Sequence, residues 1–307
     1  MDAHAEERWR DPAWLAEAVA WVDARLTEAG RPRTGDVDQV HVRPWATAIR
    51  VPTAAGPVWF KANTEELRHE ALVTHLLSRR VPHRVPPLIA DDVERGWMLM
   101  EDAGRRLREV VAEERDLSRW VDVLDGAADV ARAMEPDVDD LLAAGVPDLR
   151  LATLPDKYAA LVESIDVDRR FRDAVPRVRE MAEELATYGV TETLQHDDLH
   201  DGQVFVTGDR QLILDWGDAV VSHPFFTLSV TLEGVVAWGL DDVEGSVDLA
   251  PLVAGYLRRY DADRPELADA VPLALRLGWA SRAVNGTTVE DLQSTRNRLA
   301  MFLDGRV

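Results

Sequence analysis

The residues best suited to chemistry lie in one short stretch, LQHDDLHDGQVFV at positions 194–206, and in the apolar run after it. Counting from His196, the stretch places an acid at Asp198 and an amide at Gln203, and the run LILD then ends at Asp215. A carboxylate and an amide oxygen at the ends of adjacent strands suit a hard divalent cation such as Mg²⁺, which completes its shell with water and phosphate oxygens. Asp198, ahead of that pair, can accept a hydrogen bond from a substrate hydroxyl and align it for attack on a phosphoryl group.

A phosphate donor also needs a positive clamp, and the use of lysine in this chain indicates one. The chain has 35 basic residues, and only Lys61 and Lys157 among them are lysines. Lys61 ends the run VWFK, and Glu70 lies on the helix predicted to follow. There the Glu70 carboxylate can pair with the ammonium and hold it toward phosphates.

Strands and helices must position these residues, and hydrophobic spacing predicts where they lie. Residues 11–30 have apolar side chains at helical spacing and end at a glycine, which predicts an opening helix. Residues 38–61 contain short β-like runs separated by Pro and Ala-Gly turns, which predicts strands joined by hairpins. A helix is predicted over 64–80, with a weak cap at its start, and a strand, turn and strand follow, ending at Met100.

The second part of the chain has a different character. After Gly104 the pattern is helical to about residue 187. Short β-like segments then surround the acidic stretch, and residues 223–303 return to helical spacing. The layout predicted is a small strand-rich lobe with one helix, followed by a larger helical lobe that carries a strand-loop-strand insertion.

Composition narrows the classes of protein and partner. At 307 residues the chain is long enough for two lobes, and its 46% hydrophobic share is that of a globular protein. The net charge of -21 disfavours nucleic acid and anionic membranes as partners and favours a cationic ligand. The absence of cysteine excludes disulfides and thiolate metal sites. The charged first residues lack the layout of a signal peptide, and no apolar run is long enough to span a membrane, so we expect a cytoplasmic protein.

The motifs resemble those of the aminoglycoside phosphotransferase and choline kinase superfamily, bilobal relatives of protein kinases. That family has a loop close to H-G-D-L-H-x-G-N and then a strand ending I-D-W/F-G-D, and this chain has HDDLHDGQ followed by LDWGD. The resemblance covers roughly residues 40–235 and implies an α+β, protein-kinase-like fold. The implied domains are a strand-rich, nucleotide-binding N-lobe over 1–101 and a mostly helical C-lobe over 102–307, which carries the catalytic loop and the substrate-binding helices.

The resemblance also implies a role for each matching residue. It makes ATP and Mg²⁺ the cofactors of a small-molecule kinase that phosphorylates a hydroxyl. The implied roles are Asp198 as catalytic aspartate, Asp215 and Gln203 as Mg²⁺ ligands, Lys61 as phosphate-binding lysine with Glu70 as its partner, the backbone of Glu101, Asp102 and Ala103 as adenine clamp, and His196 as the residue that orients the loop.

The chain departs from the family pattern in several places. Gln203 stands where most members carry Asn, although bacterial maltokinases, which are also similar, have Gln there, and this favours sugars as acceptors. The interval from Lys61 to Glu70 is short, and His223 precedes Pro224 where the family often has Asp-Pro. The run RPWATAIRV takes the place of a glycine-rich loop. A pseudokinase that binds nucleotide without transfer is therefore an alternative, and a histidine-aspartate phosphohydrolase is a second one.

The acceptor site is less well defined by the sequence. We expect the helices after residue 223 to wall it, and an aromatic and acidic group there would suit a sugar or an amino sugar, namely Glu233, Trp238, Asp241 and Asp242. The hydroxylated acceptor would be a sugar, an amino sugar or an aminoglycoside. We also expect His200 to fix the loop by hydrogen bonds, Asp218 to assist the metal or the substrate, Trp216 to be buried, and Asp197 and Asp201 to be exposed.

Overall fold

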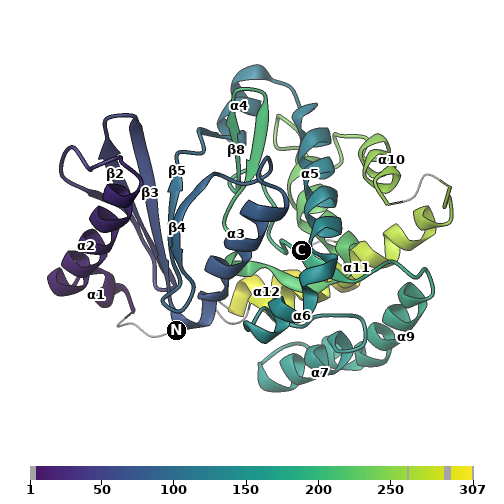
Figure 1. Ribbon diagram of the computed structural model, residues 1–307. Coiled ribbons are helices and arrows are strands. Elements are labelled where there is room, and N and C mark those ends of the chain that lie inside the picture. Colours follow the sequence, from purple (N-terminus) through teal and green to yellow (C-terminus); the bar gives the residue numbers. More distant parts are fainter. Residues whose placement is uncertain (1–4, 261–262, 287–291, 306–307) are drawn as a thin grey trace. The chain divides into compact units, whose positions relative to one another are not determined.

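The computed structural model describes residues 5–260, 263–286 and 292–305 (Figure 1). Their internal contacts divide the chain into two compact units. The first ends at Gly104, close to the boundary predicted between 101 and 102, and includes Leu214–Gly217 from later in the chain. The second runs from Arg105 to Ile213 and continues from Asp218. The predicted α+β fold with a strand-rich first part and a mostly helical second part is confirmed.

The first unit is one antiparallel sheet with helices on both faces. Its strands pair in the order β1-β2-β3-β5-β4. Figure 1 shows α1 and α2 on one side of this sheet and α3 on the other. The elements are α1 (Ala5–Arg10), α2 (Pro12–Glu28), β1 (Asp38–Val42), β2 (Ala46–Thr53), β3 (Gly56–Asn63), α3 (His69–Arg80), β4 (Leu88–Asp92) and β5 (Trp97–Glu101). The hairpins and the opening helix are as predicted, while α1 was not predicted.

Alternation along β3 decides which way Lys61 points. Phe60 is fully buried in the core cluster that contains the apolar side chains of α2. Because successive side chains of a strand point to opposite faces, Lys61 lies on the other face of the sheet. On that face Met98 pairs with Lys61 across β3 and β5, and Met98 packs against Ala71 of α3. Helix α3 therefore covers the face that carries Lys61.

The connection from β3 to α3 explains how a short interval can still bring Lys61 and Glu70 together. A 3-10 turn, Glu65–Leu67, follows the strand, and the α-helix begins only at His69, later than predicted. The Thr64 side chain makes no capping hydrogen bond, in agreement with the weak cap expected there. Glu70 consequently lies in the first turn of α3, directly beside the end of β3.

The second unit is mostly helical and contains two small sheets. Its helices are α4 (Leu107–Glu114), α5 (Arg119–Ala133), α6 (Val138–Ala143), α7 (Leu154–Ser164), α8 (Arg169–Asp173), α9 (Val175–Ala186), α10 (Ala250–Arg258), α11 (Leu267–Gly286) and α12 (Leu292–Asp304). Its strands are β6 (Arg105–Arg106), β7 (Thr193–Gln195), β8 (Val204–Thr207), β9 (Arg210–Ile213) and β10 (Val220–Ser222). The sheets are β6-β8-β9 and β10-β7. The predicted strand-loop-strand is confirmed, because β7 and β8 flank the acidic loop.

The expectation of helical structure over residues 223–303 is confirmed only in part, because regular α-helix begins at Ala250. Residues 224–238 form short 3-10 and π-helical turns, and no regular element is assigned from Gly239 to Leu249. Gly239 and Gly245 have φ of 64° and 73°, and Asp242 has φ of 57°. These left-handed conformations break a right-handed helix, so apolar spacing alone overpredicted helix here. Strands β6 and β10 were also missed, because two or three residues are too few to show a period.

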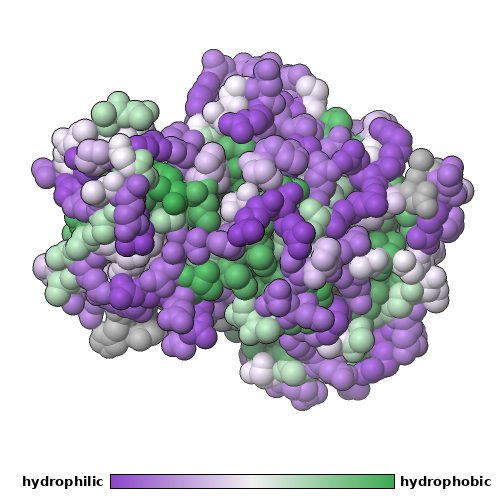
Figure 2. Space-filling view, in the orientation of Figure 1, coloured by the Kyte–Doolittle hydropathy of each residue, from purple (hydrophilic) through white to green (hydrophobic). Residues whose placement is uncertain are grey.

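The visible surface is predominantly hydrophilic, as Figure 2 shows for one face. This agrees with a chain in which 30% of residues are charged. Within the described residues, no helix combines the length and the apolar character that crossing a membrane requires.

Candidate active site

The residues predicted to form the site belong to both units. Lys61, Glu70 and Asp215 belong to the first unit, while Asp198 and Gln203 belong to the second.

In the first unit, Lys61 lies between two carboxylates. Its Nζ is 2.7 Å from Oε1 of Glu70 and 2.5 Å from Oδ1 of Asp215. The Lys61–Glu70 pair therefore forms despite the short interval between the two residues. Glu70 is held from two further sides, because its Oε2 accepts from Asn63 Nδ2 at 2.8 Å and its Oε1 accepts from the Trp216 backbone N–H at 3.1 Å. Trp216 is buried, as predicted.

Electrostatics keep this lysine charged. Burial opposes the ammonium, but the carboxylates of Asp215 and Glu70 outweigh it and raise the pKa of Lys61 above its ordinary value. Glu70 is 2% exposed, whereas the Asp215 side chain is 48% exposed. The cluster thus has two carboxylates for one ammonium, and its exposed acid is Asp215. A divalent cation would complement this charge.

The backbone around Asp215 is unusual and is also fixed. Asp215 has φ of 66°, in the left-handed region that few residues other than glycine adopt. Two residues on, the Gly217 carbonyl lies 3.0 Å from Nε2 of His69 on α3. A Cβ at Gly217 would lie 3.3 Å from Oε2 of Glu70, tighter than an ordinary contact. The segment Leu214–Gly217 therefore packs closely against the end of α3 that carries Glu70.

The predicted adenine clamp lies at the end of β5. Glu101 pairs with Val58 of β3, and its backbone N–H donates to the Pro87 carbonyl at 2.9 Å. Its carboxylate forms an ion pair with Arg31, in which Arg31 Nη2 is 3.1 Å from Oε2. The Asp102 carboxylate accepts from Trp59 Nε1 and from the Gly104 N–H, both at 2.8 Å, and Ala103 is buried. The side chains of Glu101 and Asp102 thus fix the backbone of this segment.

In the second unit, a local hydrogen-bond network fixes the loop between β7 and β8. The Asp197 backbone N–H donates to Gln195 Oε1 at 2.7 Å, and Gln195 Nε2 donates to Asp197 Oδ1 at 3.0 Å. Asp197 has φ of 63° and is 3% exposed, so the expectation that it is exposed is wrong. Asn285 of α11 donates to its second carboxylate oxygen at 2.9 Å. Burial raises the pKa of Asp197 to about 6, against the lowering effect of Arg282.

Sequence reasoning missed Arg282, which lies behind the loop. Its side chain is 1% exposed, and Nη2 is 3.1 Å from Oδ1 of Asp198 and 3.4 Å from Oδ2 of Asp218. Its Nη1 is 3.7 Å from Oδ2 of Asp197. One buried guanidinium therefore contacts three acids, and a metal or substrate role for Asp218 stays a prediction. The available signal was an arginine within the small and apolar residues of LGWASRAV on α11.

The far end of the loop is fixed through His200, as predicted. His200 Nδ1 accepts from the Gly202 backbone N–H at 2.9 Å and lies 3.3 Å from Arg108 Nη2. The same Arg108 atom donates to Asp201 Oδ1 at 2.8 Å, so Asp201 is paired and only partly exposed, contrary to expectation. The Gln203 backbone N–H donates to the His200 carbonyl at 3.0 Å. His196 is buried at the start of the loop, and its orienting role stays a prediction.

The fit of Mg²⁺ to Gln203 and Asp215 rests on donor chemistry. Both offer hard oxygen donors on partly exposed side chains. In the described part of the chain, the Gln203 side-chain amide has no hydrogen-bonding partner. No group of three or more His, Cys, Asp or Glu side chains suited to a metal occurs among the described residues.

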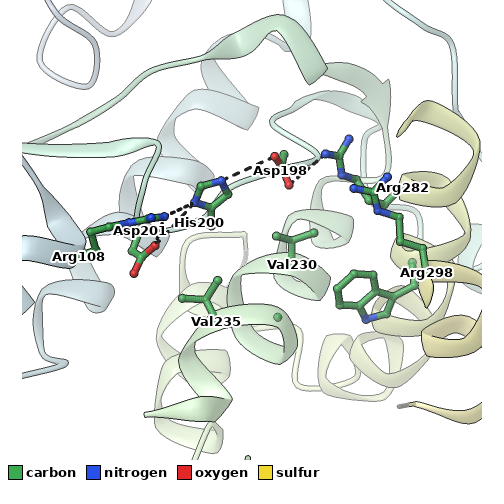
Figure 3. Close-up of a pocket in the computed structure, with 10 residues that line it drawn as sticks. Arg108, Asp198, His200, Asp201, Val230, Val235, Arg282 and Arg298 are labelled. Atoms are coloured by element: carbon green, nitrogen blue, oxygen red, sulfur yellow. Dashed lines mark hydrogen bonds and ion pairs between the residues drawn. The ribbon is translucent and has the colours of Figure 1, made fainter. Parts of the chain in front are cut away.

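A cavity of about 330 Å³ lies beside Asp198 within the second unit (Figure 3). Arg108, Asp201, His200, Asp198 and Arg282 border it in a row, and Val230 and Val235 lie across from them. Gly234, Trp279 and Arg298 complete the described lining.

The four residues predicted to wall the acceptor site are not among those that line this cavity. Glu233 forms an ion pair with Arg276 and accepts from Trp279 Nε1 at 2.6 Å. Asp241 pairs with Arg115 at 2.7 Å. Trp238 is 38% exposed, and Asp242 is exposed in the irregular segment. Of the four, Glu233 comes nearest to the predicted role, because it fixes a tryptophan that does line the cavity.

His223 takes over a capping role at the point where the family often has Asp-Pro. Its Nδ1 accepts from the Phe225 backbone N–H at 3.2 Å, at the start of the 3-10 turn Pro224–Phe226. The side chain is fully buried, and burial lowers the pKa of His223 to about 3. An imidazole nitrogen here accepts the N–H that an aspartate carboxylate can accept at the same position.

A family model described as the phosphotransferase enzyme family matches residues 57–270. The chain belongs to this family. The resemblance read from the loop and strand motifs is thereby confirmed. Among curated proteins, no sequence matches this chain.

Solved structures share the fold of this family member at low sequence identity. Macrolide 2′-phosphotransferase type I superposes with a TM-score of 0.57 at 16% identity, over 92% of this chain and 96% of the other. Choline kinase LicA from Streptococcus pneumoniae gives 0.62 at 13% identity, over 94% and 98%. The GDP and kanamycin complex of APH(2")-IIia gives 0.56 at 16% identity, over 92% and 97%. The predicted kinase-like fold therefore extends over nearly the whole chain.

Proposed function

We propose that this phosphotransferase family member transfers the terminal phosphoryl group of ATP, with Mg²⁺, to a hydroxyl group of a small molecule. The observation that carries the proposal is the Lys61 ammonium held between Glu70 and Asp215 at 2.7 and 2.5 Å. Such an ammonium is fixed in direction and kept charged, which is what binding of a phosphate requires. The solved GDP complex with the same fold supports a nucleotide as donor.

The roles of the residues follow from their chemistry. Lys61 would bind donor phosphates, and Gln203 and Asp215 would hold Mg²⁺, which when bound neutralises charge on the phosphate oxygens. Asp198, held by Arg282 on one carboxylate oxygen, would accept a hydrogen bond from the acceptor hydroxyl with the other. The backbone from Glu101 to Ala103 would contact the adenine. Catalysis would then consist mainly of positioning and charge stabilisation.

The test is the Asp198→Asn variant, assayed by ADP release with MgATP and a panel of sugars, amino sugars, aminoglycosides and choline. An amide keeps the size of the side chain but cannot orient the hydroxyl as the carboxylate does. We expect transfer to fall by at least about 10²-fold, with MgATP affinity unchanged. Transfer that survives the substitution would remove Asp198 from the mechanism.

A pseudokinase remains the second candidate, and the turn between β1 and β2 favours it. That turn, Arg-Pro-Trp at 43–45, contains no glycine and is closed by the Arg43 N–H donating to the Ala46 carbonyl at 2.9 Å. Phosphates are therefore not covered by a glycine-rich loop of the usual kind. The same assay separates the two candidates, because a pseudokinase would bind MgATP and release no ADP with any acceptor.

A further inference from the structure

The cavity beside Asp198 offers an acceptor more positive charge than the acidity of the whole chain suggests. Its described lining contains three arginines, Arg108, Arg282 and Arg298, and only two acids, Asp198 and Asp201. This lining contrasts with the chain's net charge of -21. The charge of the acceptor has to be inferred from these side chains, because they are the groups it would meet.

Both acids of the lining already form ion pairs with arginines. Asp198 Oδ1 is 3.1 Å from Arg282 Nη2, and Asp201 Oδ1 is 2.8 Å from Arg108 Nη2. An acceptor with several ammonium groups would therefore find no uncommitted carboxylate in the described lining. It would also place its charges beside guanidinium groups of the same sign, which costs binding energy.

Arg108 can bind an anionic group of the acceptor. Its side chain is 51% exposed, and Figure 3 shows it at the end of the polar row away from Arg282. Its contacts to Asp201 and His200 both use Nη2. Nε and Nη1 have no protein partner in the described residues, so each can donate a charge-assisted hydrogen bond to a carboxylate or a phosphate.

The opposite side of the cavity is apolar. Val230, Val235 and Trp279 line it, and the indole is 8% exposed and held by Glu233 at 2.6 Å. The volume of about 330 Å³ is at the low end for ligand sites, where about 300–1,000 Å³ is usual. The space suits a compact ring or chain with one apolar face, and it is small for an aminoglycoside of several rings.

We propose that this cavity takes a compact hydroxylated acceptor that carries one carboxylate or phosphate group, with that group on Arg108 and a hydroxyl at Asp198. The proposal rests on the proposed function for the role of Asp198. It replaces the cationic acceptor expected from net charge with an anionic one.

The experiment compares hexoses that differ mainly in charge, by calorimetric titration without nucleotide. The probes are glucuronate, glucose 6-phosphate, glucose, glucosamine and kanamycin. We expect at least one of the two anionic hexoses to bind in the millimolar range or better, and at least about tenfold more tightly than glucosamine, with kanamycin not bound. Tighter binding of glucuronate would indicate a carboxylate site, and tighter binding of glucose 6-phosphate a phosphate site.

Two variants assign the preference to Arg108. Arg108→Gln should abolish the preference for the anion, while Arg108→Lys should keep part of it, because the charge stays but the planar fork is lost. Arg105→Gln is the matched control, since Arg105 is a nearby exposed arginine, ion-paired to Glu113 at 2.7 Å, that does not line the cavity. It should leave the preference unchanged.

The proposal is overturned if glucosamine or kanamycin binds as tightly as the anions, if neither anion binds at millimolar concentration, or if the preference survives Arg108→Gln. Failure of the proposed function would look different. In that case the anion would bind with the Arg108 dependence described, but MgATP would yield no ADP with any acceptor.

Discussion

Replacing Arg282 by methionine tests whether a single buried charge holds the acidic loop together. Methionine has a similar length and no charge, so Arg282→Met leaves Asp197, Asp198 and Asp218 without the guanidinium that lies 3.1–3.7 Å from them. The cost is greatest at Asp197, because this residue is 3% exposed and water cannot solvate the carboxylate in place of the guanidinium. Removing one partner of a buried ion pair costs about 3–5 kcal/mol. For a unit of this size that corresponds to a fall in Tm of roughly 6–20 °C.

The loss should depend on pH in a way that a packing defect does not. The pKa of Asp197 is raised to about 6, so its contribution to stability is greatest below about pH 3.8 and is lost as pH rises toward 6. Arg282 lowers this pKa, and its removal raises it further. At pH 5 the Asp197 carboxyl of the folded variant stays protonated, so the higher pKa adds no cost there. At pH 8 the unfolded chain ionises this carboxyl freely and the folded chain does not. Each pH unit by which the pKa of Asp197 rises in the variant therefore lowers the free energy of unfolding at pH 8 by about 1.4 kcal/mol more.

The assay is chemical unfolding of wild type and variants at pH 5 and pH 8. Arg172→Met is a matched control, because Arg172 donates to the backbone carbonyls of Val162, Ile165 and Val167 at 3.0–3.1 Å and leaves no carboxylate behind. Its deficit should be the same at both pH values. Adding Asp197→Asn to Arg282→Met should recover part of the loss at pH 8. An Arg282→Met deficit that is equal at pH 5 and pH 8 would refute the electrostatic reasoning.

Two further predictions concern Lys61 and His223. Lys61→Met removes the ammonium between Glu70 and Asp215, so MgATP affinity should fall at least about tenfold in a fluorescent-nucleotide titration. Lys61→Arg should restore little of this affinity, because a planar guanidinium does not replace a compact ammonium. Unchanged MgATP affinity in Lys61→Met would argue against a phosphate role for Lys61. Burial lowers the pKa of His223 to about 3, so its contribution to stability is present above pH 6.5 and is lost as pH falls, by about 2 kcal/mol between pH 7 and pH 5. His223→Asn keeps an acceptor for the Phe225 N–H but cannot titrate, so it should abolish the loss of about 2 kcal/mol that His223 contributes between pH 7 and pH 5. If the free energy of unfolding of the variant changes with pH as that of the wild type does, His223 is not the group responsible.

The sequence indicated the local parts of the site because their information is local. The spacing from His196 to Gln203 fits one loop between two strands, and β7 and β8 flank that loop. Alternation in PVWFK set Phe60 and Lys61 on opposite faces of β3, and this decided which helix Lys61 would meet. His200 fixes the loop through neighbours two and three residues away. Periodicity and short-range hydrogen bonds are readable without a structure because they depend on neighbours in the chain.

Tertiary structure decided what lies around those parts. Asp197 looked like an exposed turn acid, yet it is buried because Arg282 and Asn285 reach it from α11, more than eighty residues later. The acids at 233 and 241 looked like an acceptor wall, but Arg276 and Arg115 bind them, and a cavity bordered by Arg108 and Arg282 lies beside Asp198 instead. An acid has the same one-letter code whether water or a guanidinium surrounds it. Burial and pairing are set by which distant segments pack together, and so the charge of the acceptor cavity emerged only from the folded chain.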